Sequence, residues 1–113
     1  MQPFSLGKIS VATPGTPVPL TTNATLMACR VRIESIIGEA GRVFLGVQGM
    51  NKATLAGVIK QFWPTGVAGP APAIPVDSWQ AIEEGGDNTI QLSRLFVDAN
   101  TANEGVVVEY WQS

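Results

Sequence analysis

The nine residues MACRVRIES (27–35) decide the fold, because apolar and charged side chains alternate along them. The odd-numbered positions from Met27 to Ile33 are Met, Cys, Val and Ile, whereas the even-numbered positions from Arg30 to Glu34 are charged. A two-residue period is typical of a β-strand that buries one face and exposes the other. Residues 27–35 therefore predict a half-buried strand.

The alternation stops and then returns on the C-terminal side of this strand. Residues 38–41 read GEAG, a composition typical of a loop, and RVFLGVQ (42–48) alternates again. Two alternating runs that flank a short glycine-containing loop are typical of a β-hairpin. The sequence thus predicts that 27–35 and 42–48 pair with each other.

The N-terminal side combines a strand pattern with prolines. Ile9 and Val11 alternate with polar or small residues in 7–13, and PGTPVP (14–19) follows with three prolines. Proline lacks the N–H that a central strand needs, so this region predicts an edge strand or an extended arm. We divide the chain into an N-terminal arm or edge strand, 1–20, and a single β-sandwich domain, 21–113.

Further short strands are expected along the rest of the chain. Residues 54–63 fit a strand or a helix, and Gly57 with the β-branched Val58-Ile59 favours the strand. The prolines and glycines of 64–75 predict a loop. A short strand or a helical turn capped by Ser78 is expected at 79–84, a turn at 85–88, and strands near 90–97 and 106–111. About eight strands at this spacing predict an all-β, antiparallel sandwich or barrel.

Composition excludes several functional classes. The 113 residues suit one domain, and only seven are basic and nine acidic, giving a net charge of −2. Scattered cations argue against a nucleic-acid partner, and no apolar run is long enough to span a membrane. No secretory signal is visible, so we expect synthesis in a cytoplasm. With no histidine and one cysteine, the sequence predicts neither a metal site, a cofactor nor an enzyme.

Three candidate sites have simpler structural interpretations. Cys29 lies on the apolar face of its strand and is interpreted as a core thiol rather than a nucleophile. Asp98, Glu104 and Glu109 offer carboxylates for glycoside hydrolysis, but nothing predicts the burial that raises a carboxyl pKa. The oxygen-rich stretch 98–105 resembles a calcium loop, yet it lacks the ligand rhythm, so a hydrogen-bonded turn is preferred.

The tryptophans and several glycines each allow a functional and a structural interpretation. Trp63, Trp79 and Trp111 would form a sugar-binding platform if they shared one exposed face, and otherwise belong to the core or to interfaces. Isolated glycines at 46, 49 and 57 do not make a phosphate loop and predict bulges or close backbone contacts.

Several segments together resemble the capsid decoration, or cement, proteins of tailed bacteriophages, a family of small jelly-roll-like proteins. The similar stretches are GKISVATPGTPVPL (7–20), GVI (57–59), DSW (77–79), NTIQL (88–92), FVDA (96–99) and GVVVEY (105–110). The resemblance implies a jelly-roll-like β-sandwich that trimerises on the outer face of the virion capsid and clamps adjacent major capsid proteins. Such a role requires no reactive residue.

The proline-rich regions are the expected contact surfaces. Prolines reduce the entropy lost on docking, and an open strand edge offers main-chain hydrogen bonds, so we assign capsid or trimer contacts to 2–20 and the 64–75 loop. Deletion of 2–19 is expected to abolish capsid binding and leave a folded trimer. The alternative function is a carbohydrate-binding or receptor-binding β-sandwich module of a virion. The predicted contact residues are Pro3, Phe4, Leu6, Lys8, Pro14, Pro17, Val18, Pro19, Leu20, Pro70 and Pro72.

Overall fold

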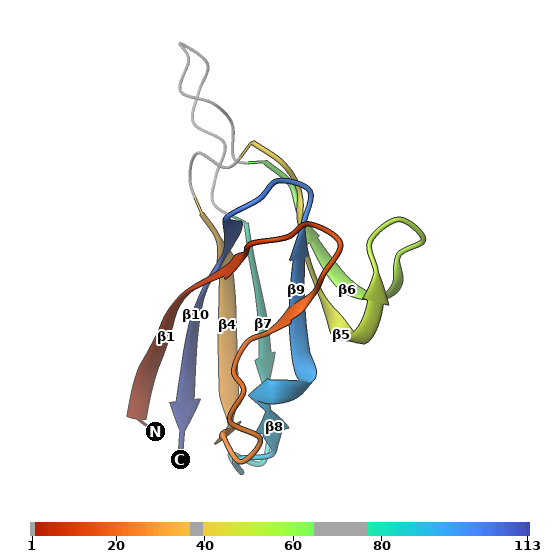
Figure 1. The fold of residues 1–113 in the computed structure, drawn as a ribbon. Helices are drawn as coiled ribbons and strands as arrows, with labels where there is room; N and C mark the ends of the chain where they lie inside the picture. Colours follow the sequence, from red (N-terminus) through yellow and green to blue (C-terminus); the bar gives the residue numbers. More distant parts are fainter. Residues whose placement is uncertain (1, 37–39, 65–76) are drawn as a thin grey trace.

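The fold is an antiparallel β-sandwich, as the alternation predicts. A computed structural model describes residues 2–36, 40–64 and 77–113, which form ten strands in two four-stranded sheets and one two-stranded ribbon (Figure 1). Residues 65–75 of the predicted 64–75 loop, with Pro70 and Pro72, and residues 38–39 of the 38–41 loop lie outside the described ranges. The described part of the chain contains no helix long and apolar enough to cross a membrane.

Sheet 1 has the strand order β1-β10-β4-β7, with every neighbouring pair antiparallel. Alternation sets its two faces: Val31 and Ile33 of β4 point inward and are fully buried, and Arg32 points outward. Trp79 of β7 pairs with Ile33 and also lies on the inner face. The strands are β1 (Gln2–Val11), β10 (Glu104–Gln112), β4 (Arg30–Ser35) and β7 (Ser78–Ile82).

Sheet 2 has the order β2-β9-β5-β6 and packs its inner face on that of sheet 1. Val43 and Leu45 of β5 enter the core, together with Val97 of β9 and Phe62 of β6. The strand preferred for 54–63 is confirmed as β6. The strands are β2 (Val18–Pro19), β9 (Leu95–Ala99), β5 (Val43–Asn51) and β6 (Ala56–Phe62).

A small ribbon interrupts the strand predicted at 27–35. β3 (Met27–Ala28) pairs with β8 (Ile90–Gln91), and the chain joins sheet 1 only from Arg30. Cys29 sits at the break, where its N–H and its thiol both donate to the Trp111 carbonyl, at 2.9 and 3.3 Å. Its side chain is 1% exposed, which confirms the core thiol. Because the break shifts the alternation, Ala28 and not Met27 is fully buried.

The strand order is that of a jelly roll. Apart from the ribbon, the eight remaining strands, renumbered along the chain, have the orders 1-8-3-6 and 2-7-4-5, so successive strands often change sheets. The predicted hairpin between 27–35 and 42–48 is therefore wrong, because β4 and β5 lie in different sheets. Alternation identifies a strand from its own residues, whereas its partners come from distant segments. Residues 79–84, left open between strand and helix, contribute β7.

Candidate functional site

The N-terminal segment is an edge strand followed by a loop that reaches sheet 2. β1 pairs with β10 over its whole length, and the ring of Phe4 stacks on that of Tyr110 with centroids 5.2 Å apart. Leu20 is 3% exposed and belongs to the core, so its side chain offers no contact surface. Of the other predicted contacts, Pro3, Phe4, Lys8 and Pro14 are exposed, and Leu6, Pro17, Val18 and Pro19 are half-buried.

The free edge of β1 carries features that discourage the addition of another strand. Pro3 has no N–H to donate, and a bulge interrupts the register between Ser5 and Gly7, where Gly7 has a φ of 71°. Lys8 is an exposed charge on the same strand. This edge is thus suited to contact through side chains rather than through a continuous main-chain ladder.

Asp98 fixes the proline-rich loop to the outer face of sheet 2. Its side chain is 1% exposed, and Oδ1 accepts hydrogen bonds from the N–H groups of Gly15, at 2.9 Å, and Ala99, at 2.8 Å. The loop is closed locally by a bond from Thr16 N–H to the Thr13 carbonyl. Asp98 therefore has a structural role at the end of β9.

Replacement of Asp98 by alanine is expected to destabilise the fold by about 3 kcal/mol, because two amide donors lose a charged acceptor. Asp98→Asn keeps an oxygen acceptor and is expected to lose about 1 kcal/mol. Urea denaturation of the two variants and the native chain measures both values. Equal stability of the alanine variant and the native chain would show that the loop is not held by this carboxylate.

Asp98, Glu104 and Glu109 do not form the catalytic pair, nor 98–105 the calcium loop, that the sequence allows but does not favour. Glu104 accepts hydrogen bonds from the N–H groups of Ala40 and Gly41, at 2.7 and 2.9 Å. Glu109 lies on the outer face of sheet 1, whereas Asp98 belongs to sheet 2, so they do not face each other as a pair. Among the described residues, no group of three acidic, cysteine or histidine side chains could hold a metal ion. The stretch 98–105 consists of the end of β9, a four-residue connection at 100–103 and the start of β10.

The three tryptophans lie on different surfaces. Trp79 faces the core, and Trp111 lies on the outer face of sheet 1, with the Arg30 guanidinium 4.5 Å from its ring centroid. Trp63 follows β6 of sheet 2, is 60% exposed and packs against Arg42, at 4.4 Å. The side-by-side aromatic platform required for the sugar-binding interpretation is therefore not formed.

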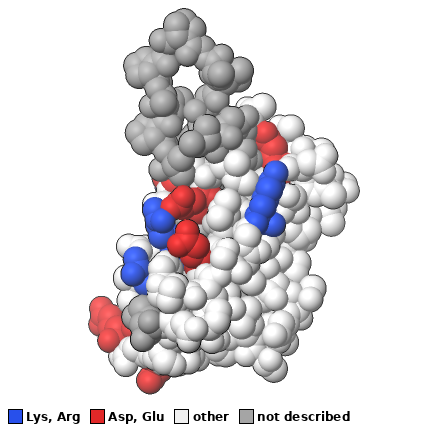
Figure 2. Space-filling view, turned by 90° about the vertical axis from the view of Figure 1, so that its left-hand side faces the viewer, with Lys and Arg blue, Asp and Glu red and all other residues white. Residues whose placement is uncertain are grey.

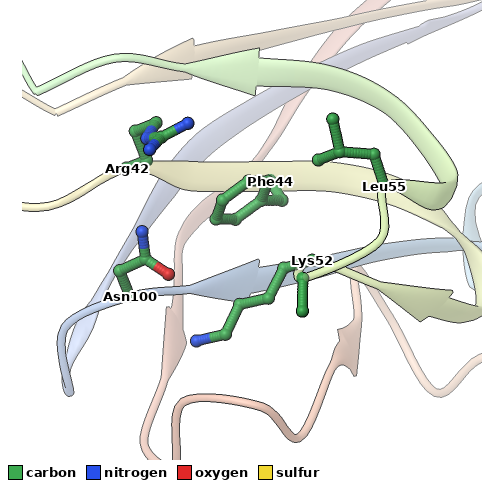
Figure 3. Close-up of a pocket in the computed structure, with 6 residues that line it drawn as sticks. Arg42, Phe44, Lys52, Leu55 and Asn100 are labelled. Carbon is green, nitrogen blue, oxygen red and sulfur yellow. The ribbon is translucent and has the colours of Figure 1, made fainter.

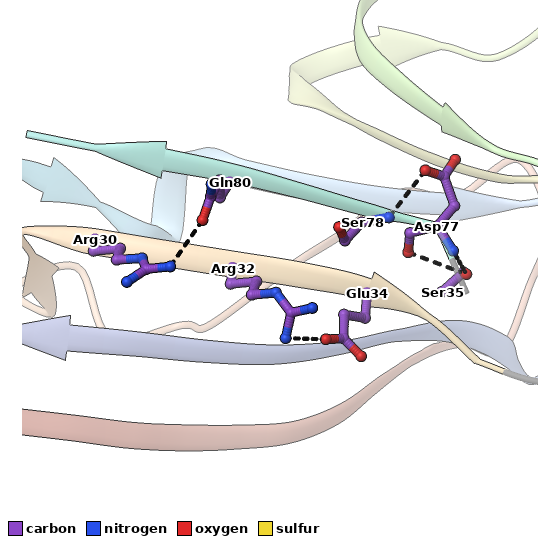
Figure 4. Close-up of polar contacts among 7 residues, drawn as sticks. All are labelled: Arg30, Arg32, Glu34, Ser35, Asp77, Ser78 and Gln80. Carbon is purple, nitrogen blue, oxygen red and sulfur yellow. Dashed lines mark hydrogen bonds and ion pairs between the residues drawn. The ribbon is translucent and has the colours of Figure 1, made fainter. Parts of the chain in front are cut away.

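The outer face of sheet 1 carries charges of both signs on a largely uncharged surface (Figure 2). Arg32 and Glu34 form an ion pair, and Arg30 Nη2 donates to Gln80 Oε1 at 3.0 Å (Figure 4). At the end of β4, the Ser35 hydroxyl accepts a hydrogen bond from Asp77 N–H at 3.0 Å. The Arg30–Gln80 and Ser35–Asp77 contacts connect β4 with β7 and the residue before it, whereas the Arg32–Glu34 pair neutralises charge within β4.

A pocket of about 380 Å³ on sheet 2 was not predicted from the sequence. The ring of Phe44 lies at its base, and the connection between β5 and β6 folds over one side of it (Figure 3). Phe44 is 3% exposed, and the sequence alone gives no reason to separate it from the core. We call this hollow the Phe44 pocket; its lining residues are Arg42, Phe44, Lys52, Ala53, Leu55 and Asn100.

Glycines shape the β5–β6 hairpin beside the pocket. A Cβ on Gly46 would lie 2.4 Å from the Gly57 carbonyl oxygen, and the β5–β6 register shifts at Gly46. Gly57 and Gly49 have φ values of 71° and 81°. The prediction of bulges or close backbone contacts is confirmed for Gly46 and Gly57.

The chain was compared with known protein families, with curated proteins and with solved structures. None of the three comparisons finds a match.

Proposed function

We propose that this chain is a virion structural protein that binds the outer surface of a tailed-phage capsid as a homotrimer and cements adjacent major capsid proteins. The observation that carries the proposal is the jelly-roll strand order, an architecture used by viral capsid proteins and by lectins. It agrees with the jelly-roll-like fold that the sequence resemblance implies. The protein would be made in the host cytoplasm and act on the virion.

The low charge of the chain supports an assembly role. The sequence has 16 charged residues, 14%, against about 25% in average soluble domains. Surfaces divided among trimer mates, a capsid and solvent need fewer charges than the surface of an isolated monomer. The lectin use of the same fold is less well supported here, because the tryptophans are dispersed over separate surfaces.

Cementing follows from mass action. A ligand that binds the mature lattice and not its dissociated subunits stabilises the lattice by an amount that grows with ligand concentration over Kd. Three linked copies raise the effective local concentration of each contact, so modest individual contacts give long occupancy. Stabilisation of the head then needs no catalysis.

The proposal predicts co-sedimentation with mature capsids of a phage that carries this gene, after the capsids have been stripped of the protein. Rebinding is expected to raise the temperature at which the heads release DNA. Capsids that neither retain the protein nor gain stability would contradict the proposal.

The N-terminal contact surface needs a point-mutation test, because β1 is paired along its length and Val11 is fully buried. Deletion of 2–19 would therefore disrupt sheet 1 as well as the contact. The double variant Lys8→Glu with Pro14→Asp changes exposed positions and is expected to bind capsids at least about tenfold more weakly, or ~1.4 kcal/mol. Arg94→Glu, at an exposed site outside this surface, is the matched control and should bind normally. Native-like occupancy by the double variant would exclude this surface while leaving capsid attachment intact.

A further inference from the structure

The Phe44 pocket keeps two positive charges next to apolar surface. Arg42 donates to Gln61 Oε1 at 3.1 Å and packs on the Trp63 ring, and Lys52 Nζ donates to the Ala99 carbonyl at 2.6 Å. These partners are all uncharged. Among the residues that the structure describes, no carboxylate lines the pocket and neither cation has an ion-pair partner. The pocket is thus complementary to a negatively charged group.

The rim of the pocket extends the binding surface beyond the size of a small anion. Leu55, which is 45% exposed, lines the pocket, and Trp63, which is 60% exposed, packs against the Arg42 guanidinium next to it. Leu55 has a φ of 65°, a left-handed conformation that costs a leucine about 1–2 kcal/mol. Leu55 belongs to the turn between β5 and β6, where the Val58 N–H donates to its carbonyl. An exposed apolar rim next to two cations is complementary to an apolar side chain next to a carboxylate.

The chain itself carries a surface of this composition. Ile82, at the end of β7, is 55% exposed, and the following turn contains Glu83, Glu84 and Asp87. Glu83 stabilises the turn by accepting a hydrogen bond from the Thr89 hydroxyl at 2.9 Å. Glu84 and Asp87 are exposed, and in the part of the chain that the structure describes they form no ion pair.

The acidic turn and the pocket lie at opposite ends of the sandwich. β7 runs toward the lower end in Figure 1, where β8 also lies, whereas β9 ends and β5 begins at the upper end, next to Arg42 and Asn100. One copy therefore cannot bring the two surfaces together within itself. Two copies can, in a head-to-tail contact.

We infer that the 82–87 turn of one copy docks into the Phe44 pocket of a second copy. Glu84 and Asp87 lie against Arg42 and Lys52, and Ile82 covers the apolar rim. The two surfaces differ, so the contact is heterologous, and a rotation of one third of a turn between successive copies closes a three-membered ring. This inference deepens the trimer part of the proposed function and rests on it.

Charge reversal tests the contact in solution without capsids. Sedimentation velocity up to the highest soluble concentration is expected to show self-association of the native chain. The pocket variant, Arg42→Glu with Lys52→Glu, and the turn variant, Glu84→Lys with Asp87→Lys, should each associate at least tenfold more weakly. The variant with all four changes should recover association, because the charges remain complementary. Circular dichroism melting monitors folding, and Arg94→Glu is the matched control.

Each outcome separates this contact from capsid attachment. A monomeric native chain, pocket and turn variants that associate normally, or no recovery in a folded four-change variant would overturn the contact. Loss of capsid binding by a pocket variant that still trimerises would assign the pocket to the capsid and also overturn it. If the four-change variant recovers self-association and native trimers do not bind capsids, the contact is upheld and the proposed function is contradicted.

Discussion

Replacement of Gly105 with alanine is expected to destabilise the protein by more than about 3 kcal/mol, beyond the usual range for overpacking. A Cβ at this position would lie 1.8 Å from the Ile9 carbonyl oxygen and 3.0 Å from Ser10 Cα. Both clashing atoms belong to the backbone of β1, so the added methyl group can be accommodated only if β1 and β10 move apart. The melting temperature should fall by roughly 12 °C, at about 4 °C per kcal/mol for a domain of this size.

Gly85→Ala is the matched control for this prediction. A Cβ at Gly85 meets nothing closer than 3.7 Å, the carboxylate oxygen of Asp87. Its melting temperature should stay close to that of the native protein. Equal melting temperatures for the Gly105 and Gly85 variants would mean that β1 does not approach β10 as closely as described.

Truncation of Ile33 to alanine is expected to cost about 2–5 kcal/mol. The side chain is fully buried at the centre of sheet 1, between β10 and β7, so its removal leaves a cavity enclosed by Val108 and Trp79. Guanidinium denaturation measures the loss. A shift of the midpoint without a change of slope will show that the native fold is retained.

Ile59→Ala is the control of the same residue type. Ile59 is 45% exposed on β6, and its truncation should change stability by no more than about 0.5 kcal/mol. If both isoleucine variants lost the same free energy, the inward face assigned to Ile33 would be wrong.

The sequence predicts individual strands well because their signal is local. The alternation from Val31 to Ile33 requires one face to be buried, and that face is buried. The partners of β4 are not local, since they come from Glu104–Gln112 and Ser78–Ile82. The sequence predicts a hairpin between β4 and the next strand, β5, whereas the structure places these two strands in different sheets.

The site is less predictable than the fold because distant residues assemble it. Arg42 precedes β5, Lys52 and Leu55 belong to the β5–β6 connection, and Asn100 follows β9. Only the pairing of β5 with both β6 and β9 brings them together. The sequence instead predicts contact surfaces in the proline-rich regions, because the effect of proline on the backbone does not depend on the fold.

The position of β10 also governs when the protein can fold during its synthesis. β1 has β10 as its neighbour in sheet 1, and Gln2 pairs with Gln112 across more than a hundred residues of chain. Contacts of such long sequence separation are formed slowly. A nascent chain that has not yet released residues 104–112 from the ribosome leaves β1 without its partner and one edge of β4 unpaired. The interval before residues 104–112 leave the ribosome is therefore the period in which this domain is most exposed to aggregation and to chaperones.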